Sequence, residues 1–107
     1  MCGIAGVVDL GGKRPVPAGM LQAMAGAIRH RGPDEDGFLD RPGIGLASRR
    51  LSIVGLADGR QPIRNENSTV FVVFNGEIFD YPQFKSRLEG RGHRFITHCD
   101  TEVIAHL

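Results

Sequence analysis

The chain opens with the stretch Met1-Cys2-Gly3-Ile4-Ala5-Gly6, which decides how the rest of the sequence is interpreted. A cysteine directly follows the initiator methionine and begins an apolar run that continues through Val7 and Val8. Removal of Met1 would give Cys2 a free α-amino group beside its thiol. Such a residue carries both a nucleophile and a base that can activate it. The alternative is that Cys2 is a small apolar residue buried at the start of a strand.

Size and composition predict one small globular domain over residues 1–107. Hydrophobic residues form 41% of the chain and charged residues 23%, proportions that argue against disorder. The formal net charge of +1 gives no field that would select nucleic acid or an anionic membrane. No apolar run is long enough to span a bilayer. We therefore expect a cytoplasmic protein with neither nucleic acid nor a membrane as its partner.

Hydrophobic patterning predicts a mixed α/β layered domain. Strands are expected at residues 2–9, 38–40, 44–54, 70–74 and 94–97. The near-continuous apolar runs at 2–9 and 70–74 predict strands buried on both faces, and the acidic stretch 33–37 predicts a loop. Helices are expected from Pro17, after Asp80 in a capping-box pattern with Gln83, and from Asp100. That last helix looks only just begun, so we expect the sequence to be part of a longer protein.

Arg49 and Arg50 are consecutive in a predicted strand, so their side chains should point to opposite faces. One guanidinium must then enter an apolar layer or a cavity, where it needs an anionic partner. A carboxylate held by two parallel hydrogen bonds is the partner that arginine suits best. Asp34, Asp36 or a ligand could supply that carboxylate.

Asn75-Gly76 follows directly on the predicted strand 70–74. An asparagine amide and the next backbone N–H can converge as two donors, which is the geometry of an oxyanion hole. The same dipeptide is also common in plain turns. The sequence around these residues leaves both interpretations open.

Glu77 and Asp100 are acidic residues that also admit two interpretations. Asp100 suits a helix N-cap, and Glu77 suits a solvated charge at a strand end. Together they could instead neutralise the ammonium group of a ligand. With Arg50 on the other side, such a pocket would suit a zwitterionic amino acid, but spacing alone does not show that the three residues meet.

We expect neither a metal site nor a cofactor in this segment. His93, His98 and Cys99 lie near one another in the sequence but lack paired zinc-ligand spacing, and surface histidines are the simpler account. Neither the dinucleotide fingerprint nor the Walker A spacing occurs. The Gly-x-Ser-x-Gly pattern of a serine nucleophile is absent as well.

Six motifs occur together in the order and spacing of a known family. They are Met1-Cys2-Gly3-Ile4-Ala5-Gly6, Arg29-His30-Arg31-Gly32-Pro33-Asp34, Arg50-Leu51-Ser52-Ile53-Val54, Gln61-Pro62, Asn75-Gly76-Glu77-Ile78 and Asp100-Thr101-Glu102. With them the whole chain resembles the glutaminase domain of glutamine-hydrolysing asparagine synthetases, a class II glutamine amidotransferase domain. The resemblance implies an α+β fold of the N-terminal nucleophile type. Its four-layer αββα sandwich of antiparallel sheets would be incomplete in this chain.

The resemblance also implies a reaction. Cys2, after removal of Met1, would attack the side-chain amide of glutamine while its own amine moves the proton. Asn75 and Gly76 would form the oxyanion hole. A γ-glutamyl thioester would form, ammonia would leave, and water would release glutamate.

The same resemblance assigns the residues that bind the substrate glutamine. Arg50 would hold the α-carboxylate, and the backbone of Ile53 and Val54 would line that pocket. Glu77 and Asp100 would hold the α-ammonium group, beside Asn75 and Gly76.

In the family, the ammonia serves the conversion of aspartate to asparagine in a C-terminal synthetase domain that uses ATP and Mg²⁺. That domain is absent from these 107 residues. Two alternatives stay open: related amidotransferases pass ammonia to other acceptors, and the chain could be a non-catalytic truncated fragment. A homodimer is also left open.

Overall fold

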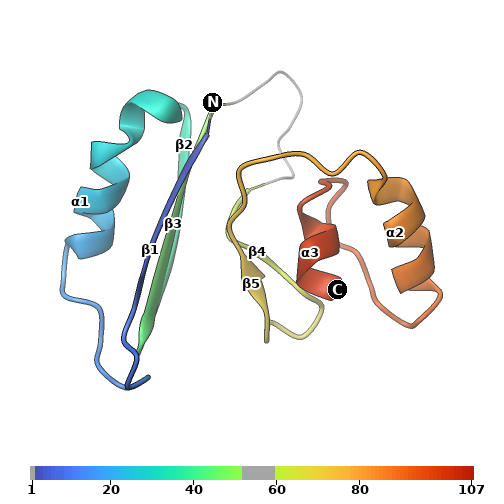
Figure 1. Ribbon diagram of the computed structural model, residues 1–107, viewed down its shortest axis with the longest axis horizontal. Helices are drawn as coiled ribbons and strands as arrows, with labels where there is room; N and C mark the ends of the chain where they lie inside the picture. The colour runs from blue at the N-terminus through green and yellow to red at the C-terminus, as the bar shows by residue number, and fades with distance from the viewer. Residues whose placement is uncertain (1, 52–59) are drawn as a thin grey trace. The chain divides into compact units, whose positions relative to one another are not determined.

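The computed structural model describes residues 2–51 and 60–107. The chain divides into two compact units, an N-terminal unit (Met1–Gly55) and a C-terminal unit (Leu56–Leu107). Each unit has its own antiparallel sheet and its own helices (Figure 1). This combination confirms the predicted α+β class, and the open sheets are consistent with part of an N-terminal nucleophile fold. No helix in the two described ranges is both long and apolar enough to cross a membrane.

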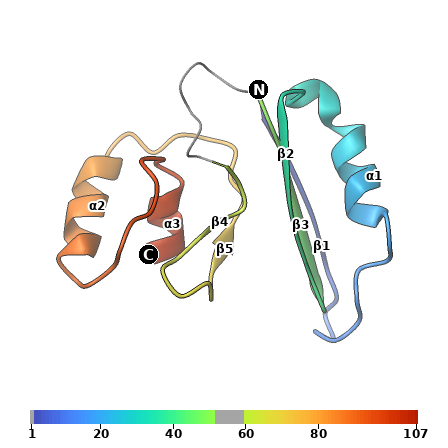
Figure 2. The same cartoon turned by 180° about the vertical axis from the view of Figure 1, so that it is seen from behind.

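The N-terminal unit is a three-stranded sheet with a helix on one face, as Figure 2 shows from behind. The sheet order is β1-β3-β2, and both pairings are antiparallel. Its elements are β1 (Gly3–Val8), α1 (Met20–Ala27), the 3₁₀ turn η1 (Arg29–Arg31), β2 (Glu35–Arg41) and β3 (Ile44–Arg50).

The core of this unit lies between α1 and the sheet. Leu21 and Ala25 of α1 pack with Ala47 of β3, and all three are at most 2% exposed. The approach is close because Gly45 has no side chain: a Cβ at that position would lie 2.8 Å from Leu21 Cδ1. Helix α1 begins at Met20, three residues later than predicted, because Gly19 precedes it in a left-handed conformation with φ of 79°.

Strand β1 is covered on one face within its unit, so the prediction of burial on both faces was wrong there. Ala5 and Val7 pack against the core cluster of Leu21, Ala25 and Ala47. Ile4 and Val8 point to the other face and are 45% and 57% exposed. An antiparallel sheet can leave one face open, and a continuous apolar run does not by itself reveal this.

Strand β2 is longer than predicted, because it includes the acidic residues that suggested a loop. The register places Glu35 opposite Arg50 and Asp36 opposite Arg49. Cross-strand pairs of opposite charge stabilise a sheet, so the acidic side chains are compatible with a strand here.

The C-terminal unit combines a short two-stranded sheet with two helices. Helix α3 packs against both strands, and α2 packs against α3 (Figure 1). The buried apolar residues are Ile63, Leu88, Val103 and Ala105. Its elements are β4 (Ile63–Arg64), β5 (Phe71–Val72), α2 (Tyr81–Glu89) and α3 (Glu102–His106).

Three predictions for this unit were wrong in detail. The apolar run 70–74 forms a strand only at Phe71–Val72, both of which are half-buried. Residues 94–97 form no strand, because the backbone N–H groups of Ile96 and Thr97 donate to the Glu102 carboxylate at 2.8 and 2.6 Å instead. Asp80 occupies the N-cap position of α2 but makes no side-chain capping hydrogen bond in the described part of the chain.

Asp9 organises the loop that follows β1. Its Oδ1 accepts a hydrogen bond from Arg14 Nη2 at 2.9 Å. Its Oδ2 accepts the backbone N–H groups of Lys13 at 3.2 Å and Arg14 at 2.9 Å. The hydrogen bond from the Arg14 side chain, helped by these backbone donors, lowers the pKa of Asp9 from 3.8 to about 2.

This shift predicts an acid-sensitive contribution to stability. A carboxyl group whose pKa is lower in the folded state stabilises the protein fully above its ordinary pKa of 3.8 and loses that effect as the pH falls through about 2. We expect Asp9→Asn to lower the midpoint of thermal unfolding at neutral pH. As the pH falls to about 2, the midpoints of the variant and the unmodified chain should approach each other. Asp40→Asn, on the exposed part of β2, is the control. A difference between Asp9→Asn and the unmodified chain that does not change with pH would contradict the prediction.

Candidate active site

Cys2 directly precedes β1 and is partly buried. Its carbonyl oxygen accepts a hydrogen bond from Arg31 Nε at 3.1 Å. The next residue, Gly3, is buried, and a Cβ there would lie 3.1 Å from Ile28 Cδ1. The turn that follows α1 therefore holds the backbone from which the Cys2 thiol extends.

Gly32 lets the segment after η1 lie directly on β3. A Cβ on Gly32 would be 2.4 Å from the carbonyl carbon of Arg49 and 2.5 Å from the nitrogen of Arg50. The Gly32 carbonyl accepts a hydrogen bond from Arg49 Nε at 2.9 Å. Two residues later, the Asp34 N–H donates to the Arg50 carbonyl at 3.1 Å. This close approach connects the segment that holds Cys2 to the strand that carries Arg50.

Arg49 and Arg50 are both buried, and each is 8% exposed. Arg49 Nη1 lies 3.1 Å from Asp36 Oδ2, so one of the predicted carboxylates is confirmed as a partner. Arg50 Nη1 lies 3.1 Å from Glu35 Oε2, a residue that the sequence did not single out. A guanidinium has five N–H donors, so Arg50 has the capacity to bind a second carboxylate beside Glu35.

In the C-terminal unit, Gln61 fixes the backbone just before Asn75. Its Nε2 donates to the Phe74 carbonyl at 3.0 Å, and the Phe74 N–H donates to its Oε1 at 2.7 Å. The buried side-chain amide thus pairs with Phe74 as a neighbouring strand would. The motif Gln61-Pro62 indicated that this position matters, but nothing in the sequence pointed to the contact.

Asn75, Gly76 and Glu77 follow as an exposed segment. A Cβ on Gly76 would lie 2.7 Å from Phe74 Cζ, so the ring of Phe74 packs against the glycine. The two residues predicted to form an oxyanion hole are therefore at the surface of their unit, where a ligand can reach them.

Asp100 holds the other end of that segment. Its Oδ2 accepts the Ile78 N–H at 2.7 Å, and its Oδ1 accepts a weak hydrogen bond from Cys99 Sγ at 3.6 Å. Thr101 rather than Asp100 occupies the N-cap position of α3, so the capping interpretation of Asp100 was wrong. Asp100 thus binds the backbone of Ile78, the residue directly after Glu77. Asp100 and Glu77 are the two carboxylates predicted to bind the ammonium group.

The predicted site residues consequently form two groups, one in each unit. Cys2 and Arg50 belong to the N-terminal unit, and Asn75-Gly76-Glu77 and Asp100 belong to the C-terminal unit. The convergence of the two groups around one substrate stays a prediction. Ile53 and Val54 lie outside the described residues.

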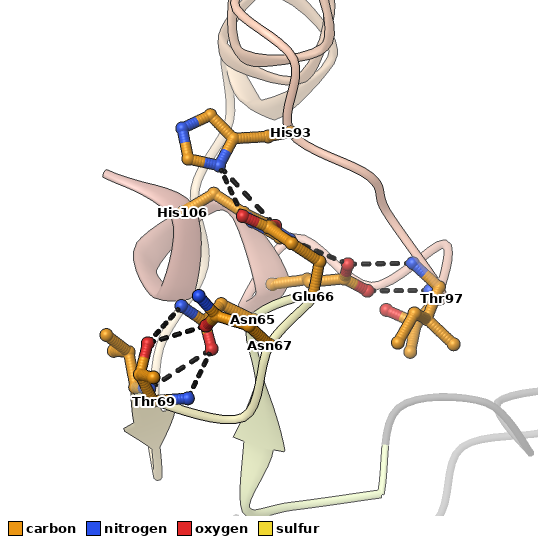
Figure 3. A network of polar contacts seen from close by, with 10 residues as sticks. Asn65, Glu66, Asn67, Thr69, His93, Thr97 and His106 are labelled. Atoms are coloured by element: carbon orange, nitrogen blue, oxygen red, sulfur yellow. Dashed lines mark hydrogen bonds and ion pairs between the residues drawn. The ribbon is translucent and has the colours of Figure 1, made fainter.

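A polar network that the sequence did not predict lies in the C-terminal unit (Figure 3). His93 Nδ1 is 3.1 Å from Glu66 Oε1, and His106 Nδ1 is 2.7 Å from Glu66 Oε2. On the other side of its ring, His106 Nε2 is 3.0 Å from Glu102 Oε2. The only regular spacing in this network is the one-turn separation of Glu102 and His106 along α3, so the sequence offered almost no means of finding it.

Both carboxyl groups of this network are held in the ionised form. Burial would raise the pKa of Glu102, but hydrogen bonds from the Thr97 side chain, from His106 and from backbone N–H groups outweigh it and lower the pKa. A hydrogen bond from its own backbone N–H lowers the pKa of Glu66, and His93 and His106 lower it further against the opposing effect of burial. Negative charge is therefore concentrated around the buried ring of His106.

An antiparallel α+β chain whose first strand directly follows a cysteine has the features of the N-terminal nucleophile class. The family model of the glutamine amidotransferase domain matches residues 1–107 of this chain. The chain therefore belongs to the glutamine amidotransferase domain family, as its motifs predicted.

The similar proteins include glutamine-hydrolysing asparagine synthetases from bacteria and plants. Asparagine synthetase 2 of Bacillus subtilis is 42% identical over 109 residues, which cover 100% of this chain and 14% of that protein. Asparagine synthetase 1 of B. subtilis is 38% identical, with 97% of this chain and 17% of that protein covered. Asparagine synthetase 1 of Arabidopsis thaliana is 37% identical, with 100% and 18% covered. The chain thus spans less than a fifth of the length of these curated relatives.

The contact of Gly32 with β3 predicts a steric effect. We expect Gly32→Ala to lower the free energy of unfolding by about 1–3 kcal/mol, because the new methyl group would meet backbone atoms of Arg49 and Arg50. Gly26→Ala is the matched control. Gly26 lies in α1 with no neighbouring atom within 4 Å of a methyl group added there, and alanine favours helix by up to about 1 kcal/mol. Urea denaturation measures both variants, and equal stabilities would contradict the prediction.

Proposed function

We propose that this chain catalyses the glutaminase step of a longer protein, the hydrolysis of glutamine to glutamate and ammonia. The observation that carries the proposal is the position of Cys2, which directly precedes β1 and whose backbone is held by Arg31. Membership of the glutamine amidotransferase domain family supports the same substrate. The relatives described above are named as glutamine-hydrolysing enzymes.

In the proposed reaction, removal of Met1 gives Cys2 its free amine. The thiol sulfur attacks the side-chain carbonyl carbon of glutamine, and the amine takes the thiol proton. The same amine then passes that proton to the departing nitrogen, so that ammonia leaves and a γ-glutamyl thioester remains. Water attacks the thioester with the amine again as the base, which releases glutamate and restores the thiol.

The carboxylate end of the substrate is assigned to Arg50. Its guanidinium is already buried and oriented by Glu35, so little ordering is needed when a second carboxylate binds. The backbone of Ile53 and Val54 is proposed to line the same pocket, as the family resemblance implies. Arginine suits this role because its planar donors match a carboxylate.

The reacting amide and the ammonium end are assigned to the C-terminal unit. Asn75 and Gly76 are proposed as the oxyanion hole, and loss of one such donor typically lowers the rate by about a hundredfold to a thousandfold. Glu77 and Asp100 are proposed to bind the α-ammonium group. The hydrogen bond from the Ile78 N–H to Asp100 supports this assignment, because it ties the segment that contains Glu77 to Asp100.

The fate of the ammonia is proposed from the relatives' names together with the family resemblance. We infer that it serves the ATP- and Mg²⁺-dependent conversion of aspartate to asparagine in a C-terminal synthetase domain. Transfer to a different acceptor is the alternative. A cytoplasmic location is part of the same proposal, as the composition suggested, and a homodimer stays open.

Ammonia release from glutamine tests the proposal, both with this chain and with the longer protein that contains it. We expect Cys2→Ala to abolish release, because the nucleophile is lost, and to leave ammonia-dependent synthesis by the longer protein intact. Cys99→Ser is the control, since its hydroxyl can still donate to Asp100. Intact mass should show Met1 removed and should show an electrophilic glutamine analogue attached at Cys2. Unchanged ammonia release in Cys2→Ala would contradict the proposal.

A further inference from the structure

The network around His106 brings three metal-binding side chains to one place in the C-terminal unit. Glu66 comes from the segment after β4, His93 from the segment after α2, and His106 from α3 itself. One ligand atom from each residue lies within 4.8 Å of the other two. Figure 3 shows His93 and His106 next to Glu66 at the centre of the network. None of these residues belongs to the proposed glutaminase site.

The hydrogen bonds of Glu102 determine which nitrogen of His106 carries a proton. Glu102 accepts the backbone N–H groups of Ile96 and Thr97, so its carboxylate acts as an acceptor. His106 Nε2, which lies 3.0 Å from Glu102 Oε2, must then be the donor. In the neutral ring this leaves a lone pair on Nδ1, on the side that faces Glu66.

That Nδ1 atom is buried and is not satisfied by a hydrogen bond. The His106 side chain is 0% exposed, and its Nδ1 makes no hydrogen bond with any described residue. Glu66 Oε2 nevertheless lies only 2.7 Å away. Nδ1 and Glu66 Oε2 therefore face each other at close range in a geometry that does not form a hydrogen bond, as two ligand atoms of one cation would.

We propose that Glu66, His93 and His106 bind a transition-metal cation of the zinc type. Two imidazole nitrogens and one carboxylate oxygen are a known ligand set for zinc, with a fourth position for water. Magnesium and calcium prefer sites made only of oxygen atoms. Glu102 completes the arrangement, because a carboxylate that accepts the second N–H of a ligating histidine orients the ring and raises its basicity.

The spacing of the ligand atoms suits such an ion after small side-chain movements. Tetrahedral zinc, with bonds of about 2.0–2.2 Å, places its ligand atoms about 3.4 Å apart. The two histidine nitrogens lie 3.1 and 2.7 Å from the Glu66 oxygens, so the carboxylate would move slightly away from both rings. The ion would cross-link three segments around the core of a unit whose described residues form a sheet of two short strands, and would stabilise it.

Metal titration of the purified chain, freed of any histidine tag and of metal by a chelator, tests the proposal. Cobalt(II) is the spectroscopic probe, and we expect one equivalent to give the visible absorption bands of tetrahedral cobalt. Zinc should displace the cobalt, abolish the bands and raise the thermal midpoint of the chain. The absence of saturable cobalt and zinc binding would overturn the proposal.

Variants of the ligands make the test specific. His93→Asn and Glu66→Gln should each weaken zinc binding by more than about a hundredfold, and Glu102→Gln by about 10–100-fold. His93 is the safest position because its side chain is 32% exposed, so its loss threatens folding least. His30→Asn, an exposed histidine of the N-terminal unit, should bind zinc as the unmodified chain does. Zinc affinity that is unchanged in both folded His93→Asn and Glu66→Gln would refute the assignment.

Discussion

The N-terminal unit depends on two buried arginine side chains that have to be neutralised inside a sheet. Removing a guanidinium from water costs several kcal/mol unless an anion and further acceptors surround it. Arg49 satisfies this requirement with Asp36, the Gly32 carbonyl and the Pro33 carbonyl, and Arg50 does so with Glu35. A shift of β2 by one residue would move Glu35 and Asp36 to the faces opposite their arginine partners, so the charge pairs favour the observed register. The same contacts hold the segment that reaches Cys2.

The sequence predicted the N-terminal unit well where periodicity controls structure. The strand predicted at residues 2–9 and the helix near Leu21 follow from apolar spacing, and both are present. Of the strand predicted at 44–54, Ile44–Arg50 forms β3, and residues 52–54 lie outside the described residues. The error at residues 33–37 has a clear physical origin. Acidic residues close to proline and glycine are typical of loops, and the arginines that make them suitable for a strand lie more than a dozen residues later. Only a known pairing of the two strands could have shown this.

The candidate site shows a different limit. The ordered set of motifs identified the family. Hydrogen bonds hold the backbone at or next to several of these motifs, as at Cys2, Phe74 and Ile78. Individual roles were harder to obtain, since Asp100 looked like a helix cap and instead binds the Ile78 N–H. The network of Glu66, His93 and His106 was beyond prediction because its members come from three separate segments; His93 and Glu66 alone are 27 residues apart. Local spacing reports neighbours along a helix or strand, and these residues are neighbours only after folding.

Gln61 has a consequence for association between chains. Two residues after β5, the backbone of Phe74 has one N–H group and one carbonyl group. Unpaired groups of this kind next to a strand can pair with a strand of another chain. Both groups are occupied by the amide of Gln61. The side chain therefore keeps the backbone beside the exposed residues Asn75 and Gly76 from pairing with another chain.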